Sequence, residues 1–530
     1  MADEKAAYSA TDSSPPPSYV PHDAEAGRKV PRSSVDDLPA DVEAGQNSGL
    51  ERTLSARHLV FLAIGGCVGT GVFLSTGPAL NKSGPASLLI AYAFVGLVTY
   101  SVMMSLGELA AFMPVAGCFT TYASRLISPS AGFATGWIYF LSWAVTYGLE
   151  LTAAGLVLQY WLPNLNIGVW IAVFWVLLTA ANFMPVRWIG EFEMWFSSIK
   201  VVTILGFFLF GICINAGASP QGYLGFKYWD NPGAFAAYKL EGSRGQAVGF
   251  FSALITATFS FLGSELVVMG AGEAANPRKA IPKAIHWTFW TIFSLFLATI
   301  LLIGLTVPSN HPSLDSEDTN ASASPLVIAA QLAGVGVLTH IINAVLLTAV
   351  LTAACSNVYS SSRILVGLSE EGHAPAFFRT TNRIATPYWS VLFSACFGLL
   401  GFLNLSSNGK QAFTWLLNLN TVAGIIAWSV ISLCHIRFRD ALAIQGLTTQ
   451  ELPYVAPFQP WLSWFGLIFT AAIALTSGFT VFIQWDTAEF FTAYISVIFF
   501  VVTYFVHWLI YRKGLVNLSD VELRSWQRAI

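Results

Sequence analysis

The chain has 530 residues, of which 55% are hydrophobic and only 10% charged, and its formal net charge is −3. Soluble domains usually carry about 25% charged residues, so this composition indicates a polytopic membrane protein. No basic cluster is interleaved with aromatic residues in the sequence, and we therefore expect no nucleic-acid partner.

The first 50 residues form a polar segment rich in Pro, Ser, Asp and Glu, without an apolar signal-peptide core. We expect a disordered cytosolic tail. Within it, Pro16, Pro17 and Tyr19 form a PPxY pattern, which presets the polyproline II conformation that WW domains bind. A WW-containing ubiquitin ligase would then modify Lys5 or Lys29. The alternative is a chance match in a Pro-rich tail.

Apolar runs of about 20 residues recur along the rest of the chain, the length that a membrane helix needs. They predict twelve membrane helices, over 58–79, 86–113, 131–160, 166–184, 192–215, 246–271, 284–307, 333–360, 388–405, 412–436, 461–483 and 490–511. The predicted organisation is therefore an N-tail over 1–50, a transmembrane domain over 51–512 and a cytosolic C-tail over 513–530.

The distribution of Lys and Arg predicts the orientation of these helices. An even number of spans places both termini on one side. With the termini inside, the tails and inner loops carry 20 of these residues and the outer loops 5. This excess predicts cytoplasmic termini. Asn320, in an outer loop, begins an Asn-Ala-Ser triplet that matches a glycosylation acceptor.

The first span contains "AIGGCVGTGVF", with Gly65, Gly66, Gly69 and Gly71 in one apolar stretch. One interpretation is helix packing, because Gly65 and Gly69 form a GxxxG pattern. The other is a helix interrupted within the membrane, which hydrocarbon tolerates only beside a cavity. The N-terminus of the second half would then point partial positive charge at an anion such as a carboxylate.

An inverted repeat would place a second break five helices later. The sixth span contains "TATFSFLGSELVVMGAGE", in which Gly263 lies near the middle between Ser260 and Ser264. This match in position favours two broken helices that face each other. The alternative is that glycine is simply common in membrane helices.

Several ionisable residues lie within predicted spans, where such residues are functional candidates by default. Among them, Glu108 is near a helix end, and we expect a structural role for it. Lys200 lies in the fifth span and would carry the proton coupling or snorkel to the interface. Glu265 follows the predicted sixth-helix break and would carry a proton or hydrogen-bond the broken backbone. Glu150 lies deep in the third span and would face a substrate or serve as a packed, protonated group.

Four longer stretches resemble the fungal amino acid permeases, of the amino acid–polyamine–organocation superfamily, over about residues 50 to 512. They are "AIGGCVGTGVFLSTGPAL", "GELAAFMPVAGCFTTYASRLISPSAGFATGWIYF", "FSFLGSELVVMGAGEAANPRKAIPKAI" and "SRILVGLSEEGHAPAFF". The resemblance implies an all-α fold of twelve membrane helices, with a five-plus-five inverted repeat followed by two further helices.

The resemblance also implies the binding residues for the common part of an amino acid. It assigns Gly69, Thr70 and Gly71 to the substrate carboxylate and Phe259 to a gating aromatic. The backbone from Phe259 to Gly263 would accept the substrate ammonium, and this segment includes Ser260, Leu262 and Gly263.

The resemblance further assigns Glu265 to the family's acidic residue after the break. Lys200 matches a fifth-helix lysine that stands where sodium-coupled relatives bind a cation, which favours coupling to protons. Motifs such as "YFLSWAVTYGLEL" and "EAANPRKAIP" most resemble the basic amino acid permeases for arginine and lysine. In that branch Glu150 would face the distal cation of the substrate. Asn420 departs from the small hydroxyl residue usual there, which leaves the specificity open.

The sequence therefore predicts a plasma-membrane amino acid:proton symporter that favours arginine and lysine. Its partners would be the amino acid, protons, the lipid bilayer and the WW-domain ligase, with no metal or other cofactor. The alternatives are a broad-specificity or neutral amino acid permease and a non-transporting sensor, although sensors of this fold have longer cytosolic tails. We expect no enzyme, because the eight His form no HExxH or similar arrangement.

Overall fold

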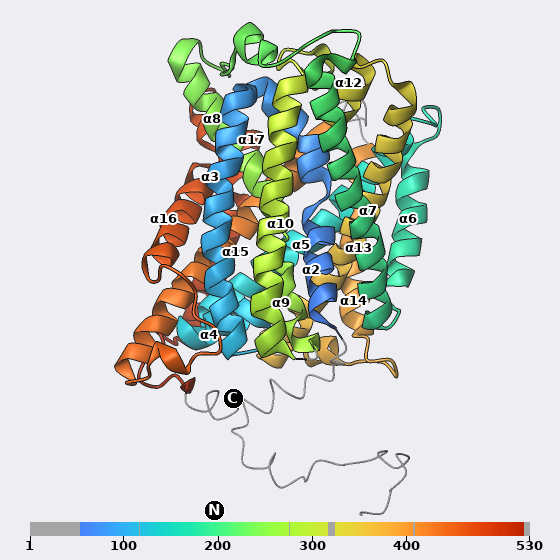
Figure 1. Cartoon of the computed structure of the whole chain (residues 1–530). Coiled ribbons are helices and arrows are strands. Elements are labelled where there is room, and N and C mark those ends of the chain that lie inside the picture. Colours follow the sequence, from blue (N-terminus) through green and yellow to red (C-terminus); the bar gives the residue numbers. More distant parts are fainter. Residues whose placement is uncertain (1–53, 116, 275, 316–323, 406–408, 524–530) are drawn as a thin grey trace, which may run out of the picture.

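Long helices run alongside one another through the molecule (Figure 1). The computed structural model describes residues 54–115, 117–274, 276–315, 324–405 and 409–523. The main helices are α2 (Ala56–Cys67), α3 (Thr76–Phe112), α4 (Cys118–Leu126), α5 (Pro129–Leu158), α6 (Ile167–Ala181), α7 (Val186–Cys213), α8 (Gly242–Phe261), α10 (Pro277–Thr306), α13 (Gly336–Glu370), α14 (Tyr388–Cys396), α15 (Gly409–Ile444), α16 (Trp461–Thr476) and α17 (Thr487–Tyr511). Shorter pieces include a π-turn (Gly71–Ser75), α9 (Leu266–Met269), η5 (Gly270–Glu273), α11 (Pro312–Asp315) and α12 (Pro325–Leu332).

Nine helical segments of the described chain are long and apolar enough to cross a membrane. The first, Ala56–Phe112, is 57 residues long and joins the predicted first and second spans. Gly84, at φ 79°, and Pro85 interrupt the helix between them. The helices α6 and α16 are apolar but shorter. Each predicted span thus has a helical counterpart, while the count of twelve stays a prediction.

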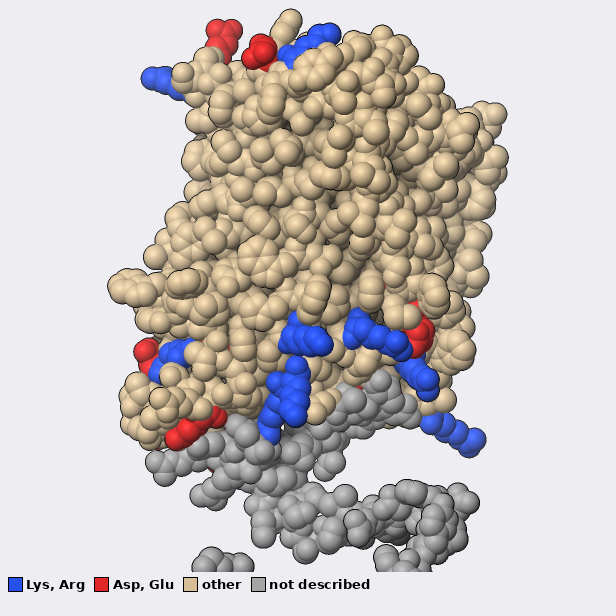
Figure 2. Space-filling view, in the orientation of Figure 1, with Lys and Arg blue, Asp and Glu red and all other residues tan. Residues whose placement is uncertain are grey.

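The helices differ in how much of their apolar surface they bury. α5 lies at the centre and packs against α13 and α15, and 83% of its most apolar 18-residue stretch is buried. α7 and α17 instead bury 22% and 17% of theirs and expose large side chains such as Trp195 and Leu209. Figure 2 shows an uncharged belt between the charged ends, as expected of a surface that faces lipid.

Some helix boundaries differ from the sequence prediction. α4 was not expected, because nine residues are too few for a span and its helix is amphipathic rather than wholly apolar. α13 continues well past the predicted end at residue 360 and includes Arg363. The helix continues because Arg363 is buried there against Glu273, so its charge does not end the packed segment.

The beginning of α2 and the segment after α17 lie at the same end of the bundle (Figure 1). Leu54 forms a short parallel bridge with Ala274, and the Val516 N–H donates to the Ile127 carbonyl at 2.8 Å. In the view of Figure 2, most of the visible Lys and Arg side chains gather at this end.

Candidate functional site

The helix of the first span is interrupted between Cys67 and Gly71. The backbone of Val68, at φ −84° and ψ 81°, leaves the helical region, and helical structure resumes at Gly71. A Cβ on Gly71 would lie 2.7 Å from the Ser260 Cα, so only glycine allows this close approach to α8. The predicted break therefore exists, and glycine serves contact between the two segments as well as the break itself.

The second predicted break lies between α8 and α9. Leu262 has extended backbone angles, and Gly263 takes φ +102°, a conformation that favours glycine. A Cβ there would lie 3.1 Å from the Gly66 carbonyl and the Cys67 nitrogen. The Cys67 thiol also donates to the Ser260 carbonyl at 3.1 Å. The two breaks thus touch each other within the bundle.

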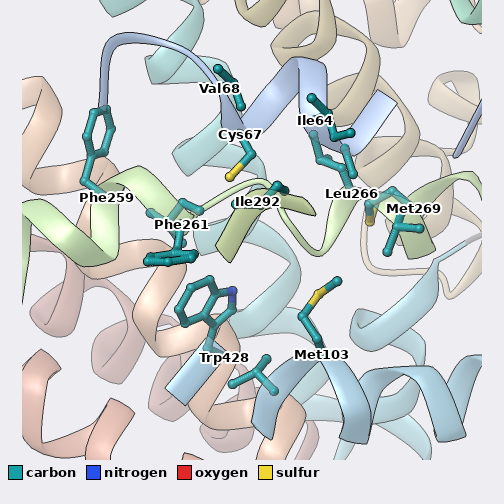
Figure 3. Close-up of a cluster of buried hydrophobic side chains, with 14 of the residues drawn as sticks. Ile64, Cys67, Val68, Met103, Phe259, Phe261, Leu266, Met269, Ile292 and Trp428 are labelled. Carbon is teal, nitrogen blue, oxygen red and sulfur yellow. The ribbon is translucent and has the colours of Figure 1, made fainter. Parts of the chain in front are cut away.

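The aromatic side chains next to this contact have different surroundings. Figure 3 shows Cys67 between the two broken helices, with Phe259 beside the chain that follows Val68 and Phe261 directed toward Trp428. The Phe261 ring packs against Phe296 with centroids 5.1 Å apart. Phe261 therefore belongs to the core, while Phe259 is left beside the break in α2.

A cavity lies at the meeting point of the two breaks. Its empty volume, which includes space open to solvent, is about 390 Å³. It is lined by Gly66, Cys67, Gly69, Thr70, Gly71, Ser142, Trp143, Thr146, Glu150, Phe259, Leu262, Glu265, Asn357 and Asn420. Of the residues named from the sequence, Gly69, Thr70, Gly71, Glu150, Phe259, Leu262, Glu265 and Asn420 are in this lining.

Glu150, on α5, is the acidic residue best placed to contact a ligand. Its side chain is 4% exposed, and its Oε1 accepts a hydrogen bond from Thr70 Oγ1 at 3.0 Å. Its Oε2 is buried and has no hydrogen-bond partner within the described chain. A buried carboxylate oxygen without a partner is costly, so a ligand that brings a donor or a positive charge would stabilise it.

Two donors in the lining also have no protein partner. Asn357 Nδ2, on α13, and Trp143 Nε1, on α5, are buried without a hydrogen-bond partner among the described residues. Asn420 differs, because its side-chain oxygen accepts a hydrogen bond from Ser142. The cavity thus combines an unsatisfied acceptor with two unsatisfied donors, a pattern complementary to a molecule that carries both a cation and an anion.

Glu265 lines the cavity but is engaged by the protein. Its Oε1 accepts a hydrogen bond from Tyr139 at 2.9 Å, and its Oε2 accepts one from the Gly263 N–H at 3.1 Å. This geometry holds the non-helical backbone at Gly263. It matches the structural alternative that the sequence left open for this residue.

Three of the residues named from the sequence lie outside the lining. Ser260 is within hydrogen-bonding distance of Tyr92, at 2.6 Å, and donates to the Thr256 carbonyl. Gly263 faces the backbone of α2. Lys200, on α7, is fully buried behind α2 and donates to the Gly65 carbonyl at 2.7 Å.

The sequence analysis missed Glu193, Asn357 and Trp143. Glu193 is 2% exposed and accepts a hydrogen bond from Ser356 at 2.6 Å. Its spacing of seven residues before Lys200 places both on one helix face, a signal that was available. Asn357 was a polar residue within an apolar run and could have been flagged in the same way.

Several predicted features lie outside the described residues. They are the PPxY residues Pro16, Pro17 and Tyr19, the lysines Lys5 and Lys29, and the glycosylation residue Asn320. Within the described residues, no group of three or more His, Cys, Asp or Glu side chains is arranged to hold a metal ion.

Comparison with known proteins identifies similar sequences. The amino acid permease family model matches residues 58–519. The chain is 44% identical to the probable lysine/arginine permease CAN2 of Candida albicans, over 91% of this chain and 86% of that protein. It is 41% identical to the basic amino-acid permease of Saccharomyces cerevisiae, over 94% of this chain and 88% of that protein. It is also 39% identical to the proline-specific permease of Emericella nidulans, over 91% of this chain and 89% of that protein.

Solved structures share the fold at low sequence identity. The manganese transporter of Eremococcus coleocola, in its H236A form, matches with a TM-score of 0.55 at 14% identity, over 92% of this chain and 100% of that one. MHP1, a nucleobase-cation-symport-1 family transporter, matches with a TM-score of 0.51 at 16% identity, over 91% of this chain and 97% of that one. These likenesses confirm the predicted fold class, an all-α transporter fold.

Proposed function

Because the chain belongs to the amino acid permease family, we propose that it imports amino acids together with protons across the plasma membrane and favours arginine and lysine. Overall identity alone does not decide the substrate, since a proline-specific permease is 39% identical and a lysine/arginine permease 44% identical. The preference is therefore argued from the residues of the cavity.

The observation that carries the cationic preference is the free oxygen of Glu150. Its Oε2 is buried beside the cavity without a hydrogen-bond partner in the described chain. A guanidinium or ammonium group supplies both the donor and the positive charge that this oxygen needs. A neutral side chain would leave the carboxylate buried and uncompensated, which costs several kcal/mol unless it takes up a proton.

The two breaks provide for the groups that all amino acids share. The N-terminus of the helical segment that begins at Gly71 would bind the carboxylate, with Gly69 and Thr70 at the break. The extended backbone at Leu262 frees carbonyl groups of α8, which would accept from the ammonium. Asn357 Nδ2 would provide a further donor for the carboxylate.

Transport would proceed by rocking of the broken helices around this fixed site. Phe259 lies beside the break in α2 and would close over the bound substrate from the outside. The orientation with cytoplasmic termini rests on the 20 Lys and Arg of the tails and inner loops against 5 in the outer loops. The PPxY pattern of the N-tail would then be accessible to a cytosolic ubiquitin ligase.

Uptake of radiolabelled arginine in a permease-deficient cell tests the function. We expect concentrative uptake that increases when the medium is acidified and that lysine inhibits most strongly in a panel of twenty amino acids. Strong inhibition by neutral amino acids would indicate a broad-specificity permease instead. Binding of arginine without uptake of any amino acid would indicate a sensor.

A further inference from the structure

Glu193 is a buried carboxyl group that has no part in the proposed substrate contacts. Its Oε1 accepts a hydrogen bond from Ser356 on α13, and its Oε2 is buried without a partner in the described chain. Ser197, one turn away, lies beside this carboxyl group but donates its hydroxyl hydrogen to the Phe61 carbonyl at 3.0 Å. Half of this carboxyl group is therefore unsatisfied inside the membrane domain.

Glu193 and Lys200 both contact Gly65, on the broken helix α2. The Lys200 ammonium donates to the Gly65 carbonyl at 2.7 Å. A Cβ on Gly65 would lie only 2.1 Å from Glu193 Oε2, so that oxygen rests directly against this residue. No carboxylate of the described chain forms an ion pair with Lys200 within 4.0 Å. In this conformation of α2 the ammonium is bound to a carbonyl and, although it is near Glu193, does not form an ion pair with it.

The number of charges around the break requires a further positive charge. Three carboxyl groups, those of Glu150, Glu193 and Glu265, lie around it with the single ammonium of Lys200, counting the described residues. Buried charges in a membrane domain must be neutralised or paired. The ammonium and a cationic substrate neutralise two carboxylates, and the third requires a proton.

The hydrogen bonds indicate which carboxyl group takes that proton. Glu150 has its free oxygen toward the cavity and pairs with the substrate. Both oxygens of Glu265 already accept hydrogen bonds from the protein. Glu193 receives one hydrogen bond, has a free oxygen and has no cation within ion-pair distance among the described residues.

We propose that Glu193 carries the proton that is transported with each cationic amino acid, an inference that rests on the proposed proton-coupled import. The carboxyl group is protonated while the Gly65 carbonyl holds Lys200. When α2 tilts inward, this carbonyl leaves the ammonium, and the freed positive charge stabilises the Glu193 carboxylate. The O–H bond then breaks, and the proton passes to cytosolic water. When α2 returns, the ammonium binds the Gly65 carbonyl again and the Glu193 carboxylate takes up a proton from extracellular water, which restores the first state.

Other titratable groups surround Glu193 on the packed helices. Lys200 lies on the same helix, and α13 brings Cys355. Glu150 of α5 and Cys67 of α2 interact with Lys200 rather than with Glu193. His58 of α2 is already within 3.2 Å of Glu191. α10 carries its titratable residues in its first turns, as Arg278, Lys279, Lys283 and His286. Among these groups, Lys200 is the one whose ammonium is hydrogen-bonded to the backbone of α2.

The test uses the purified full-length protein in liposomes, with the membrane potential clamped at zero. Two assays are compared: arginine exchange without a pH gradient, and arginine accumulation driven by a gradient of about one pH unit. One proton per arginine supports about tenfold accumulation, because one pH unit corresponds to about 1.4 kcal/mol. We expect this for the wild type and for the control Glu191→Gln, whose carboxyl group lies at the surface of the same helix.

For Glu193→Gln we expect exchange to persist and gradient-driven accumulation to disappear. Accumulation by Glu193→Gln equal to that of the wild type would overturn the proposal. Glu193→Asp keeps a titratable group, so we expect accumulation with a displaced pH midpoint. An Asp variant that accumulates arginine with the same pH midpoint as the wild type would also overturn the proposal, even where the Gln variant fails to fold.

Two wild-type results separate this inference from the proposed function. Exchange of arginine without any response to the gradient would contradict proton coupling, and the role of Glu193 with it. Absence of arginine exchange, together with exchange of a neutral amino acid, would contradict the cationic preference and the charge count that leads to Glu193.

Discussion

The side chains that distinguish substrates can be tested singly, beginning with Glu150. In Glu150→Gln the amide keeps the shape of the side chain but removes the charge that would pair with guanidinium. Loss of a buried charge pair costs about 2 kcal/mol or more, so we expect the KM for arginine to rise roughly thirtyfold. The KM for a neutral amino acid, measured by competition, should change much less.

The matched control for this variant is Glu489→Gln. Glu489 is half-exposed and pairs with Lys239 at 3.4 Å, an arrangement that contributes little energy. Equal loss of arginine and neutral amino acid transport in Glu150→Gln would show that Glu150 only supports the fold.

Asn357 is predicted to bind the part of the substrate that all amino acids share. Its buried Nδ2 has no partner among the described residues, so Asn357→Ala removes a donor that only a ligand satisfies. A hydrogen bond to a charged group contributes about 1.5–3 kcal/mol, so we expect the KM for every transported amino acid to rise at least about tenfold.

α13 offers a close control, Asn343→Ala. Asn343 is also buried with unsatisfied amide atoms but is not part of the cavity lining. We expect its loss to leave transport unchanged. Similar uptake defects in both variants would argue for a packing role of these amides rather than a substrate contact.

The residue-scale comparison with the sequence shows which signals were informative. Glu150 and Lys200 were recognisable because a charge within an apolar run is costly and therefore conspicuous. Glu193 lies close to the polar start of α7, where a charged residue is ordinary, and only the fold shows that it is buried. The partners of these carboxylates are distant in sequence, since Glu193 accepts from Ser356 on α13 and Glu150 accepts from Thr70 at the first break.

At the scale of elements, the contact between the two breaks is the feature to test. Gly71→Ala would place a Cβ 2.7 Å from the Ser260 backbone, and backbone cannot move aside cheaply. We expect lost transport and a loss of roughly 1–3 kcal/mol in stability, measured as a lower Tm of the purified protein. Gly206→Ala is the control, because a Cβ there meets nothing within 4 Å. A Gly71→Ala protein with normal uptake would contradict the importance of this approach.

The sequence predicted both breaks because glycine and polar residues repeated at equivalent places in the first and sixth spans. It did not predict that Gly263 would face Gly66 rather than the cavity. Periodicity identifies an interrupted helix, whereas the direction of each carbonyl follows from dihedral angles that neighbouring helices determine. The extended course of α13 was missed for the same reason, since Glu273 is what neutralises Arg363.

At the scale of the whole molecule, the fold was predictable because the membrane restricts the solutions. Apolar runs of helical length, separated by polar loops, give the order of helices in almost any sequence. This restriction explains how the fold is shared with transporters at 14% and 16% identity. The helix count is less certain from composition, because α6 and α16 are short and the first two spans are nearly continuous.

A buried ion pair closes the bundle at the end where α2 begins, and it is predicted to govern opening there. Arg363 of α13 contacts Glu273 at 3.2 Å and stacks on Tyr359 with its guanidinium carbon 4.1 Å from the ring centroid. The Glu273 carbonyl also accepts from the Leu54 N–H at 2.9 Å, so one residue joins the start of α2, η5 and α13. Breaking a buried pair costs about 3–5 kcal/mol, which would favour the state open at this end.

Cys67 would report this opening, because it lines the cavity and is only 3% exposed in this structure. In a chain with the other five cysteines replaced, we expect Arg363→Ala to increase labelling of Cys67 by an impermeant thiol reagent applied from the proposed cytosolic side, by at least about tenfold. Arg57→Ala removes an exposed ion pair at the same end and should leave the rate unchanged. Equal rates in both variants, with arginine binding retained, would mean that opening at this end does not depend on the Arg363 pair.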